Sequence, residues 1–326
     1  MEDAPLGGLS PRAFLRRYWQ KRQLLVRRAL HGFRGAIGKS ALFSLAARRD
    51  VESRLVKRRG NDWRVGSGPF SRSSLEETGA RNWTLLVNGV NHHAAAAERL
   101  LRRFAFLPQA RLDDVMVSYA APGGGVGPHF DSYDVFLVQG AGRRIWRLSR
   151  KGAFSCEPQA PLRLIRDFVP DEEYLLEPGD LLYLPPGWGH DGVALDECFT
   201  CSVGFRAPRG AELAAAFLDY LHERGFADAQ YRDPDLRASV GGARIDPRMV
   251  SFAARQLGKV QWKRADVEDF LGRYLTLPKP NVVFNSKAFS RSRTIELHPK
   301  TQLLYSGSRF FVNGESFVPR DRKSVV

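Results

Sequence analysis

This 326-residue sequence has few cysteines, no signal-peptide pattern at its first residues and no long apolar run. There are only three cysteines, Cys156, Cys198 and Cys201. An odd number of cysteines without a secretory leader favours reduced thiols in the cytoplasm over disulfides. The first residues, MEDAPLGGLSP, lack a basic segment followed by an apolar one, so no signal peptide is expected. No apolar run approaches the ~20 residues that a membrane helix needs, so no membrane partner is expected either.

Two common motif classes are also missing. Cys198 and Cys201 form a single C-x2-C in an apolar stretch, and no second ligand pair at zinc-site spacing is evident. Buried strand cysteines are therefore the preferred interpretation. The Gly-rich GGGVG is not followed by Gly-Lys-Ser/Thr, which argues against a phosphate-binding P-loop. There is no zinc finger and no RNP-type aromatic motif.

Charge is distributed unevenly along the chain. Hydrophobic content of 43% and charged content of 26% are ordinary for a globular protein. Residues 1–60 carry a net charge of +11 and residues 281–326 a net +5, while the middle is close to neutral at −1. A basic end can lie against nucleic acid, including ribosomal RNA, or can be a solvated surface, and the sequence leaves both open.

Most local elements can be predicted from capping and spacing. Ser10-Pro11 has the pattern of a helix start, with Ser as the N-cap and Pro in the first turn. Asn91 is expected to cap a helix that runs to Phe104. A strand from Val51 to Val56 is expected to end in a basic turn at Lys57–Gly60. Further strands are expected at 24–26 and 83–87, and helices at 41–49, 211–224, 247–257 and 265–275.

Residues 114–206 change to short strands separated by turns. The turns contain PGGG, QGAG, EPGD and LPPGWG. Many short strands at this spacing predict a sandwich or barrel of the jelly-roll kind, with a mouth that can hold one small ligand. After residue 208 the expected helices have little barrel left to cover, and a hairpin is expected around 306–309. The strands are expected at 115–119, 135–138, 144–148, 180–184 and 199–205.

One stretch, PGGGVGPHFD, concentrates the candidate chemistry. His129 and Asp131 are two residues apart, so on a strand they point to the same side. His190 follows 59 positions later in PGDLLYLPPGWGHDG, after a strand and a tight Pro/Gly loop that would place it at the barrel mouth. Two imidazoles and one carboxylate form the facial triad of non-heme Fe(II) oxygenases. Taken alone, H-x-D is common, and a single histidine is more often a core residue than a ligand.

A cation lies between these histidines. Arg144 belongs to RRIW, a strand in an otherwise apolar stretch. An arginine inside a barrel requires a carboxylate or phosphate partner. A dicarboxylate cosubstrate would supply one.

Together, these motifs resemble the JmjC-type bacterial ribosomal oxygenases, also called the cupin-4 family. The resemblance is carried by PGGGVGPHFDSYDVFLVQGAGRRIWRLS, EPGDLLYLPPGWGHDG and SVGFRAP, with FLRRYWQKRQLLVRRAL near the N-terminus. It implies an α+β protein with a double-stranded β-helix core of the JmjC (cupin, jelly-roll) type and flanking helices. By this resemblance, 1–208 is the catalytic domain and 209–278 a helical dimerisation region. Residues 279–326 would be a winged-helix-like domain that looks truncated.

The resemblance also implies residue roles. His129, Asp131 and His190 match the iron ligands, and Arg144 matches the cation that binds the distal carboxylate of 2-oxoglutarate. A hydroxyl from the preceding strand should assist. Tyr119 and Ser118 are adjacent and face opposite ways, so only one can do so, and Tyr119 is preferred.

The implied activity is hydroxylation of a side-chain β-carbon in a large-subunit ribosomal protein, using Fe(II), 2-oxoglutarate and O2. Arginine is favoured as the target over histidine, and a cytoplasmic homodimer is expected. Two alternatives remain open. One is another metal-dependent cupin oxidation or a demethylation, and the other is a non-catalytic module that binds ribosomes.

Overall fold

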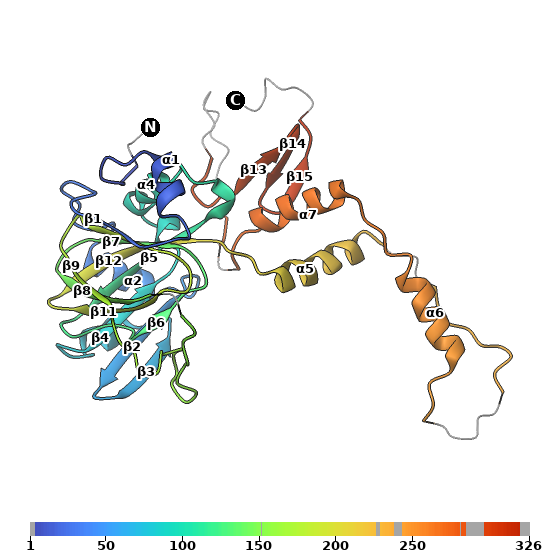
Figure 1. Ribbon diagram of the computed structural model, residues 1–326, viewed down its shortest axis with the longest axis horizontal. Coiled ribbons are helices and arrows are strands. Elements are labelled where there is room, and N and C mark those ends of the chain that lie inside the picture. The colour runs from blue at the N-terminus through green and yellow to red at the C-terminus, as the bar shows by residue number, and fades with distance from the viewer. Residues whose placement is uncertain are drawn as a thin grey trace. The chain divides into compact units, whose positions relative to one another are not determined.

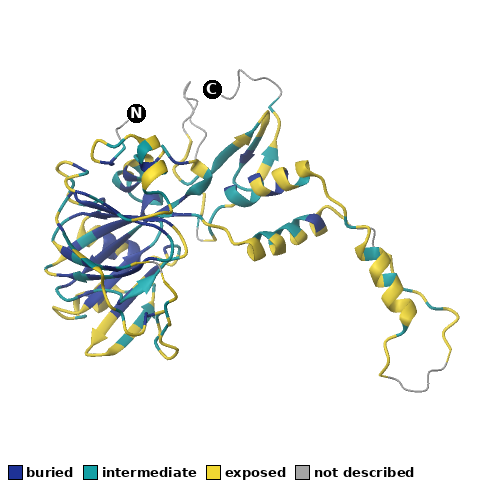
Figure 2. Cartoon of the chain, viewed as in Figure 1, coloured by how far each residue is buried: buried dark blue, intermediate teal, exposed yellow. Residues whose placement is uncertain are grey.

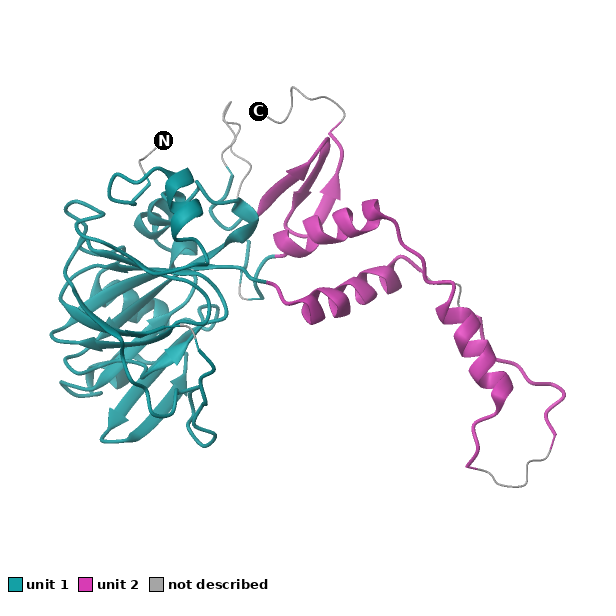
Figure 3. Cartoon of the chain, in the orientation of Figure 1, with its two compact units in different colours: residues 1–207, 278–301 teal, residues 208–277, 302–326 magenta. Residues whose placement is uncertain are grey.

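The computed structural model describes residues 4–150, 152–225, 229–237, 243–280, 282–284 and 297–319. The chain divides into two compact units, shown in Figure 3. Unit 1 contains residues 1–207 and 278–301, and unit 2 contains residues 208–277 and 302–326. The division into three domains that the sequence suggests remains a prediction, and part of its 279–326 segment lies outside the described residues.

Two antiparallel sheets form unit 1 (Figure 1). The larger has eight strands in the order β1-β10-β7-β12-β5-β4-β2-β3, and the smaller has four in the order β6-β11-β8-β9. Several neighbours, such as β1 and β10 or β12 and β5, are distant in sequence, as expected for a jelly roll. The strands are β1 Leu24–Val26, β2 Ser53–Arg59, β3 Asp62–Ser67, β4 Trp83–Val87, β5 Leu112–Ala120, β6 His129–Phe130, β7 Val135–Gln139, β8 Arg144–Ser149, β9 Glu172–Leu176, β10 Leu181–Leu184, β11 Gly189–Ala194 and β12 Cys198–Phe205.

The two sheets face each other across an apolar core. Val135 and Leu182 of the larger sheet pack in one buried cluster with Trp146 and Leu148 of the smaller. Figure 2 shows the buried residues concentrated along these strands. Two facing antiparallel sheets agree with the predicted double-stranded β-helix core.

Helices cover the other face of the larger sheet. They are α1 Pro11–Arg17, α2 Lys39–Ala46, α3 Arg72–Glu76 and α4 Ala95–Arg102. Phe14, Phe43 and Leu100 pack with Leu85 and Val117 of the sheet, so alternate residues of β4 and β5 are assigned to this side. The capped helix start is confirmed, because the Ser10 hydroxyl accepts the N–H of Ala13 at 3.2 Å.

Two local expectations were wrong. Asn91 does not cap a helix: its side-chain oxygen accepts the backbone N–H of Val115 at 2.9 Å, and α4 begins only at Ala95. The basic segment Lys57–Arg59 is not a turn either. It continues strand β2, which pairs with β3, a strand that the sequence analysis missed.

Unit 2 combines three helices with a three-stranded sheet. The elements are α5 Gly210–Glu223, α6 Pro247–Leu257, α7 Arg264–Thr276, β13 Leu303–Ser306, β14 Arg309–Val312 and β15 Glu315–Phe317. The Asp269 carboxylate of α7 is the hub of this unit. It accepts hydrogen bonds from Arg309 of β14 at 2.7 Å, Arg273 at 2.9 Å and Tyr220 of α5 at 2.9 Å.

Two further expectations concern cysteines and membranes. Cys198 and Cys201 are free thiols buried in β12, which confirms the strand interpretation. Among the described residues, no helix has both the length and the apolar character needed to cross a bilayer.

Candidate metal centre

Strand pairing brings the two histidines together. β6 and β11 are antiparallel neighbours, and His129 lies directly opposite His190. Directly opposite residues project from the same face of a sheet, so the two rings meet, with centroids 4.2 Å apart. The sequence analysis expected a strand and a Pro/Gly loop before His190, and the structure places His190 just after them, on β11. The short pairing with β6, which sequence patterns did not reveal, brings the two rings into contact.

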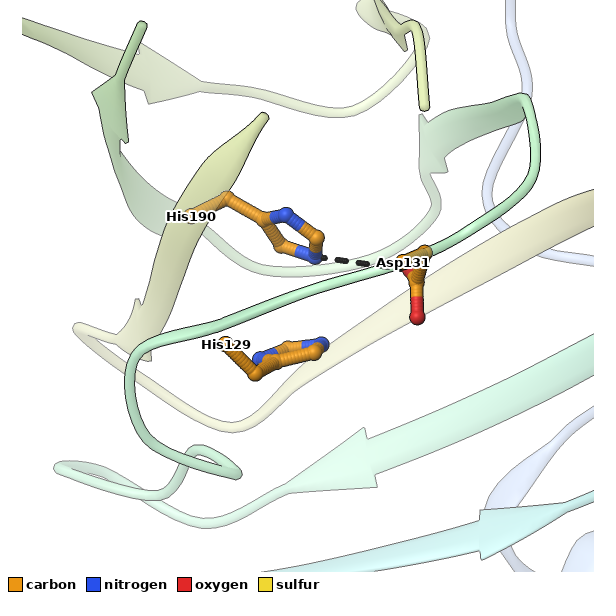
Figure 4. Close-up of side chains that lie close together, drawn as sticks. All are labelled: His129, Asp131 and His190. Atoms are coloured by element: carbon orange, nitrogen blue, oxygen red, sulfur yellow. Dashed lines mark ion pairs between the residues drawn. The ribbon is translucent and has the colours of Figure 1, made fainter. Parts of the chain in front are cut away.

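Asp131 completes the cluster. Figure 4 shows its carboxylate and the two imidazoles converging on one region. One ligand atom from each of the three side chains lies within 4.8 Å of the others. The Oδ2 atom of Asp131 is 3.7 Å from Nε2 of His190. The His190 side chain is 4% exposed and that of Asp131 is 24% exposed, so the cluster is closed behind His190 and open beside Asp131.

Both histidines are held in the tautomer that suits a metal ligand. Nδ1 of His129 lies 2.8 Å from the carbonyl of Gly127, and Nδ1 of His190 lies 3.0 Å from that of Trp188. A carbonyl oxygen can only accept a hydrogen bond, so each Nδ1 carries the proton and each Nε2 keeps a free lone pair. Ligand histidines in metalloproteins are oriented in this way.

Electrostatics keep His190 neutral. Burial, together with the neighbouring His129, lowers the pKa of His190 from 6.5 to about 4, against the opposing effect of Asp131. A metal ligand must be the uncharged imidazole. The ring is therefore ready to bind a cation at neutral pH without first losing a proton.

The Gly-rich loop is compact because the protein backbone surrounds it. A Cβ atom at Gly125 would lie 2.5 Å from the carbonyl oxygen of Gly192 in β11, and one at Gly124 would collide with the carbonyl of Trp83 in β4. A glycine-rich loop can allow a ligand to approach the backbone closely. The structure gives a different reason, because the loop is threaded between two strands and so directs the chain into β6.

Arg144 is the most unusual side chain near this centre. It lies on β8, is only 4% exposed, and points to the same side of the small sheet as Trp146 and Leu148, the residue opposite His190. Its one hydrogen bond to a described residue joins Nη1 to the Ser118 hydroxyl at 3.4 Å. Its Nε and Nη2 atoms are buried without a hydrogen-bond partner. A buried cation without an anion is strongly unfavourable, which makes Arg144 a candidate for binding an anionic ligand.

The structure corrects the choice between the two adjacent hydroxyls. Ser118 faces the interior and contacts Arg144, whereas Tyr119 lies on the opposite face of β5, among the helices. The Tyr119 ring packs against Phe43, and the ammonium of Lys39 lies 4.7 Å from its centroid. Burial raises the pKa of Tyr119 to about 12, so it remains a neutral core residue. Ser118 is therefore the hydroxyl that can assist Arg144.

Two interior polar groups escaped the sequence analysis. The Thr84 hydroxyl and the Trp146 indole N–H are buried without hydrogen-bond partners. Thr84 lies on β4 next to Ala120 of β5, and the Trp146 ring centroid is 5.6 Å from the Arg144 guanidinium carbon. Only the strand register reveals which face each occupies, so no sequence signal could have separated them from ordinary core residues.

Comparison with known proteins agrees with this geometry. A family model described as a JmjC domain matches residues 99–213. An X-ray structure of E. coli YcfD superposes with a TM-score of 0.78 and 32% identity, covering 97% of this chain and 87% of that one. The chain belongs to the JmjC-type ribosomal oxygenase family.

Other members of this family are similar over shorter spans. The E. coli "Ribosomal protein uL16 3-hydroxylase" is 43% identical over 238 residues, which is 72% of this chain and 63% of that protein. A "Probable ribosomal oxygenase" of Haemophilus influenzae is 38% identical over 237 residues, covering 71% and 56%. The chain thus spans less than two thirds of the length of these curated relatives.

A structure of YcfD in complex with cobalt and 2-oxoglutarate matches with a TM-score of 0.75 and 32% identity over 97% of this chain and 87% of that one.

Proposed function

We propose that this chain is an Fe(II)- and 2-oxoglutarate-dependent oxygenase that hydroxylates a ribosomal protein. The observation that carries the proposal is the combination of two features in one interior. Three metal-type donors converge at His129, Asp131 and His190, and a buried guanidinium without an anion lies beyond them at Arg144. A metal site alone would fit many cupins, whereas the additional unpaired cation requires an acidic cosubstrate.

The residues present fit the proposed groups. Two neutral imidazoles and one carboxylate would hold Fe(II) and leave its other positions open. Arg144 would hold the distal carboxylate of 2-oxoglutarate through charge-assisted hydrogen bonds, with Ser118 as a second donor. When bound, iron, 2-oxoglutarate and O2 supply the oxidation: the keto acid becomes succinate and carbon dioxide, and one oxygen atom enters a substrate C–H bond.

The protein's own contribution is position and exclusion of water. The carbonyls of Gly127 and Trp188 orient the two imidazoles. The apolar cluster around Trp146 and Leu148 keeps the interior dry next to the centre. The more open side of the centre, beside Asp131, leaves a substrate side chain access to it.

The substrate class rests on the relatives. The printed name of the E. coli relative specifies 3-hydroxylation of ribosomal protein uL16. We infer a large-subunit ribosomal protein as the substrate, the β-carbon as the site and arginine as the favoured residue, with histidine second. Such a substrate would place the activity in the cytoplasm. A non-catalytic ribosome-binding module is disfavoured, because binding alone does not require convergent metal donors and an unpaired buried cation.

Mass spectrometry tests the proposal directly. Ribosomes from cells that lack the enzyme are incubated with the full chain, Fe(II), 2-oxoglutarate and air, and the intact masses of the ribosomal proteins are measured. We expect one large-subunit protein to gain a single oxygen atom, and fragmentation then identifies the residue. Succinate without a mass gain would indicate another substrate, such as one for demethylation. Neither product would favour the binding module.

We also propose a homodimer formed through unit 2. This unit leaves large apolar side chains exposed, among them Leu218 of α5 at 57%, Leu257 of α6 at 71% and Trp262, between α6 and α7, at 54%. Exposed apolar groups of this density are typical of protein–protein contacts. Light scattering should give a dimer mass, and Leu218→Glu should reduce it to that of a monomer. A wild-type monomer would refute the proposal.

A further inference from the structure

The β2–β3 hairpin carries an unusual concentration of cations. Arg54, Lys57, Arg58, Arg59 and Arg64 are all exposed on this hairpin. Asp62, the only acid between them, is paired with Arg64 at 3.0 Å. Within the described part of the chain, neither Lys57 nor Arg59 forms an ion pair. Figure 2 shows the end of this hairpin as exposed, at the edge of the larger sheet.

The strand register makes this charge costly. Lys57 lies directly opposite Arg64, and Arg59 lies opposite Asp62 on the same face. This one carboxylate is paired with Arg64, so three cations share one acid on this face. Like charges directly opposite each other destabilise an antiparallel pair. No acidic side chain of the described residues forms an ion pair with Lys57, so its charge opposite Arg64 has no direct partner in the fold. A surface that retains an uncompensated cost of this kind is best explained by an anionic ligand.

The hairpin also lies beside the metal centre. A Cβ atom at Gly127, the residue whose carbonyl orients His129, would lie 3.0 Å from the Trp63 ring of β3. The Arg58 guanidinium carbon is 5.2 Å from the centroid of that ring. The cations therefore border the approach to the site.

We propose that the β2–β3 hairpin is an RNA-binding surface that engages the RNA around the target ribosomal protein. This inference rests on the proposed function. Ribosomal proteins are themselves basic partners of RNA, so a cationic border would repel the free protein and attract the phosphates beside it. Cations beside a partly exposed aromatic ring suit a polynucleotide, because phosphates pair with the charges and a base can stack on the ring. The preferred substrate is therefore the RNA-bound protein.

The test measures RNA affinity of the full chain by fluorescence anisotropy. The probe is a labelled single-stranded fragment of ribosomal RNA of about 16 nucleotides. The hairpin variant Lys57→Gln with Arg59→Gln is compared with Arg16→Gln and Arg17→Gln on α1, which removes the same charge from another exposed site. Two lost phosphate contacts should make the slope of log binding constant against log salt concentration shallower by about 1.4. They should weaken binding roughly 25-fold at about 0.1 M salt. The α1 variant should bind as the wild type does.

Several results would overturn the inference. One is a wild-type chain that does not bind the RNA, and another is an equal loss in both variants, which would reflect net charge alone. Displacement by polyglutamate as effective as that by unlabelled RNA would identify an acidic protein as the occupant instead.

Succinate formation separates this inference from the proposed function. With a free fragment of the substrate protein, the hairpin variant should form succinate at least as fast as the wild type, because less positive charge repels the basic fragment, whereas with the RNA-bound protein it should be slower. A wild type that binds RNA through the hairpin but oxidises nothing would refute the proposed function and leave the RNA site standing. Normal oxidation of both substrates by the hairpin variant would refute the RNA site alone.

Discussion

Replacing Arg144 by methionine should change stability in opposite directions with and without 2-oxoglutarate. In the absence of ligand, the guanidinium is a buried cation without an anion. Replacing buried charge with an apolar side chain of similar size commonly stabilises a protein by about 1–4 kcal/mol. For a unit of this size, each kcal/mol raises the melting temperature by roughly 2–4 °C. The ligand-free variant should therefore melt several degrees above the wild type.

The same change should remove most of the stabilisation by cosubstrate. At a 2-oxoglutarate concentration about 100 times its Kd, the wild type should gain about 2.7 kcal/mol. Loss of charge-assisted hydrogen bonds costs about 1.5–3 kcal/mol, which corresponds to a Kd that is roughly 100-fold weaker at the upper end. At the same concentration the variant would then gain only about 0.4 kcal/mol.

Thermal unfolding with and without 2-oxoglutarate measures both effects. Co(II) replaces iron in the assay, so that no turnover consumes the ligand. Arg147→Met is the matched control, because Arg147 lies on the same strand with its side chain 37% exposed and paired with Glu173 at 2.8 Å. The control should change stability by less than about 0.5 kcal/mol and keep the full ligand shift. A destabilised Arg144→Met that still responds fully to 2-oxoglutarate would refute the role assigned to Arg144.

Three further predictions follow from the same geometry. Asp131→Ala should abolish turnover with the fold intact. Asp134→Ala should instead lower the unfolding free energy by about 3–5 kcal/mol, because Asp134 is fully buried and accepts a hydrogen bond from Tyr183 at 2.7 Å. Circular dichroism measures the folding of each variant and a succinate assay its turnover, and an active Asp131→Ala would mean that the ligand set is wrong. Ser118→Ala should raise the 2-oxoglutarate concentration needed for half-maximal rate about 2- to 12-fold, while Tyr119→Phe leaves that concentration unchanged. The opposite result would identify Tyr119 as the hydroxyl that assists Arg144. Burial lowers the pKa of His92 from 6.5 to about 4, so this group should reduce stability as pH falls from 6.5 towards 4, by on the order of 3 kcal/mol. Urea titrations of wild type and His92→Gln should therefore diverge over that range, and parallel curves would contradict it.

Much of the local structure could be predicted because it depends on near neighbours. The Ser10-Pro11 cap is a contact across three residues, and the structure confirms it. The same logic failed at Asn91, whose side chain bonds to Val115 on another strand, a partner 24 positions away. The hairpin strand β3 was missed because its alternation of polar and apolar residues spans only Asp62 to Val65 and ends at Gly66, so its pairing with β2 is what defines it.

The sequence by itself determined the donor types and the spacing of the candidate site. His129 and Asp131 two residues apart, a distant His190 and an arginine in an apolar strand predict oxygenase chemistry, since side-chain type and local alternation require only the chain. The tertiary structure decided which groups meet. The pairing of β6 with β11 joins His129 to His190, and the register of β5 places Ser118 rather than Tyr119 beside Arg144. Whether Arg144 has an anionic partner could also be read only from the packed interior, because burial and the lack of a partner arise from contacts between segments far apart in the chain.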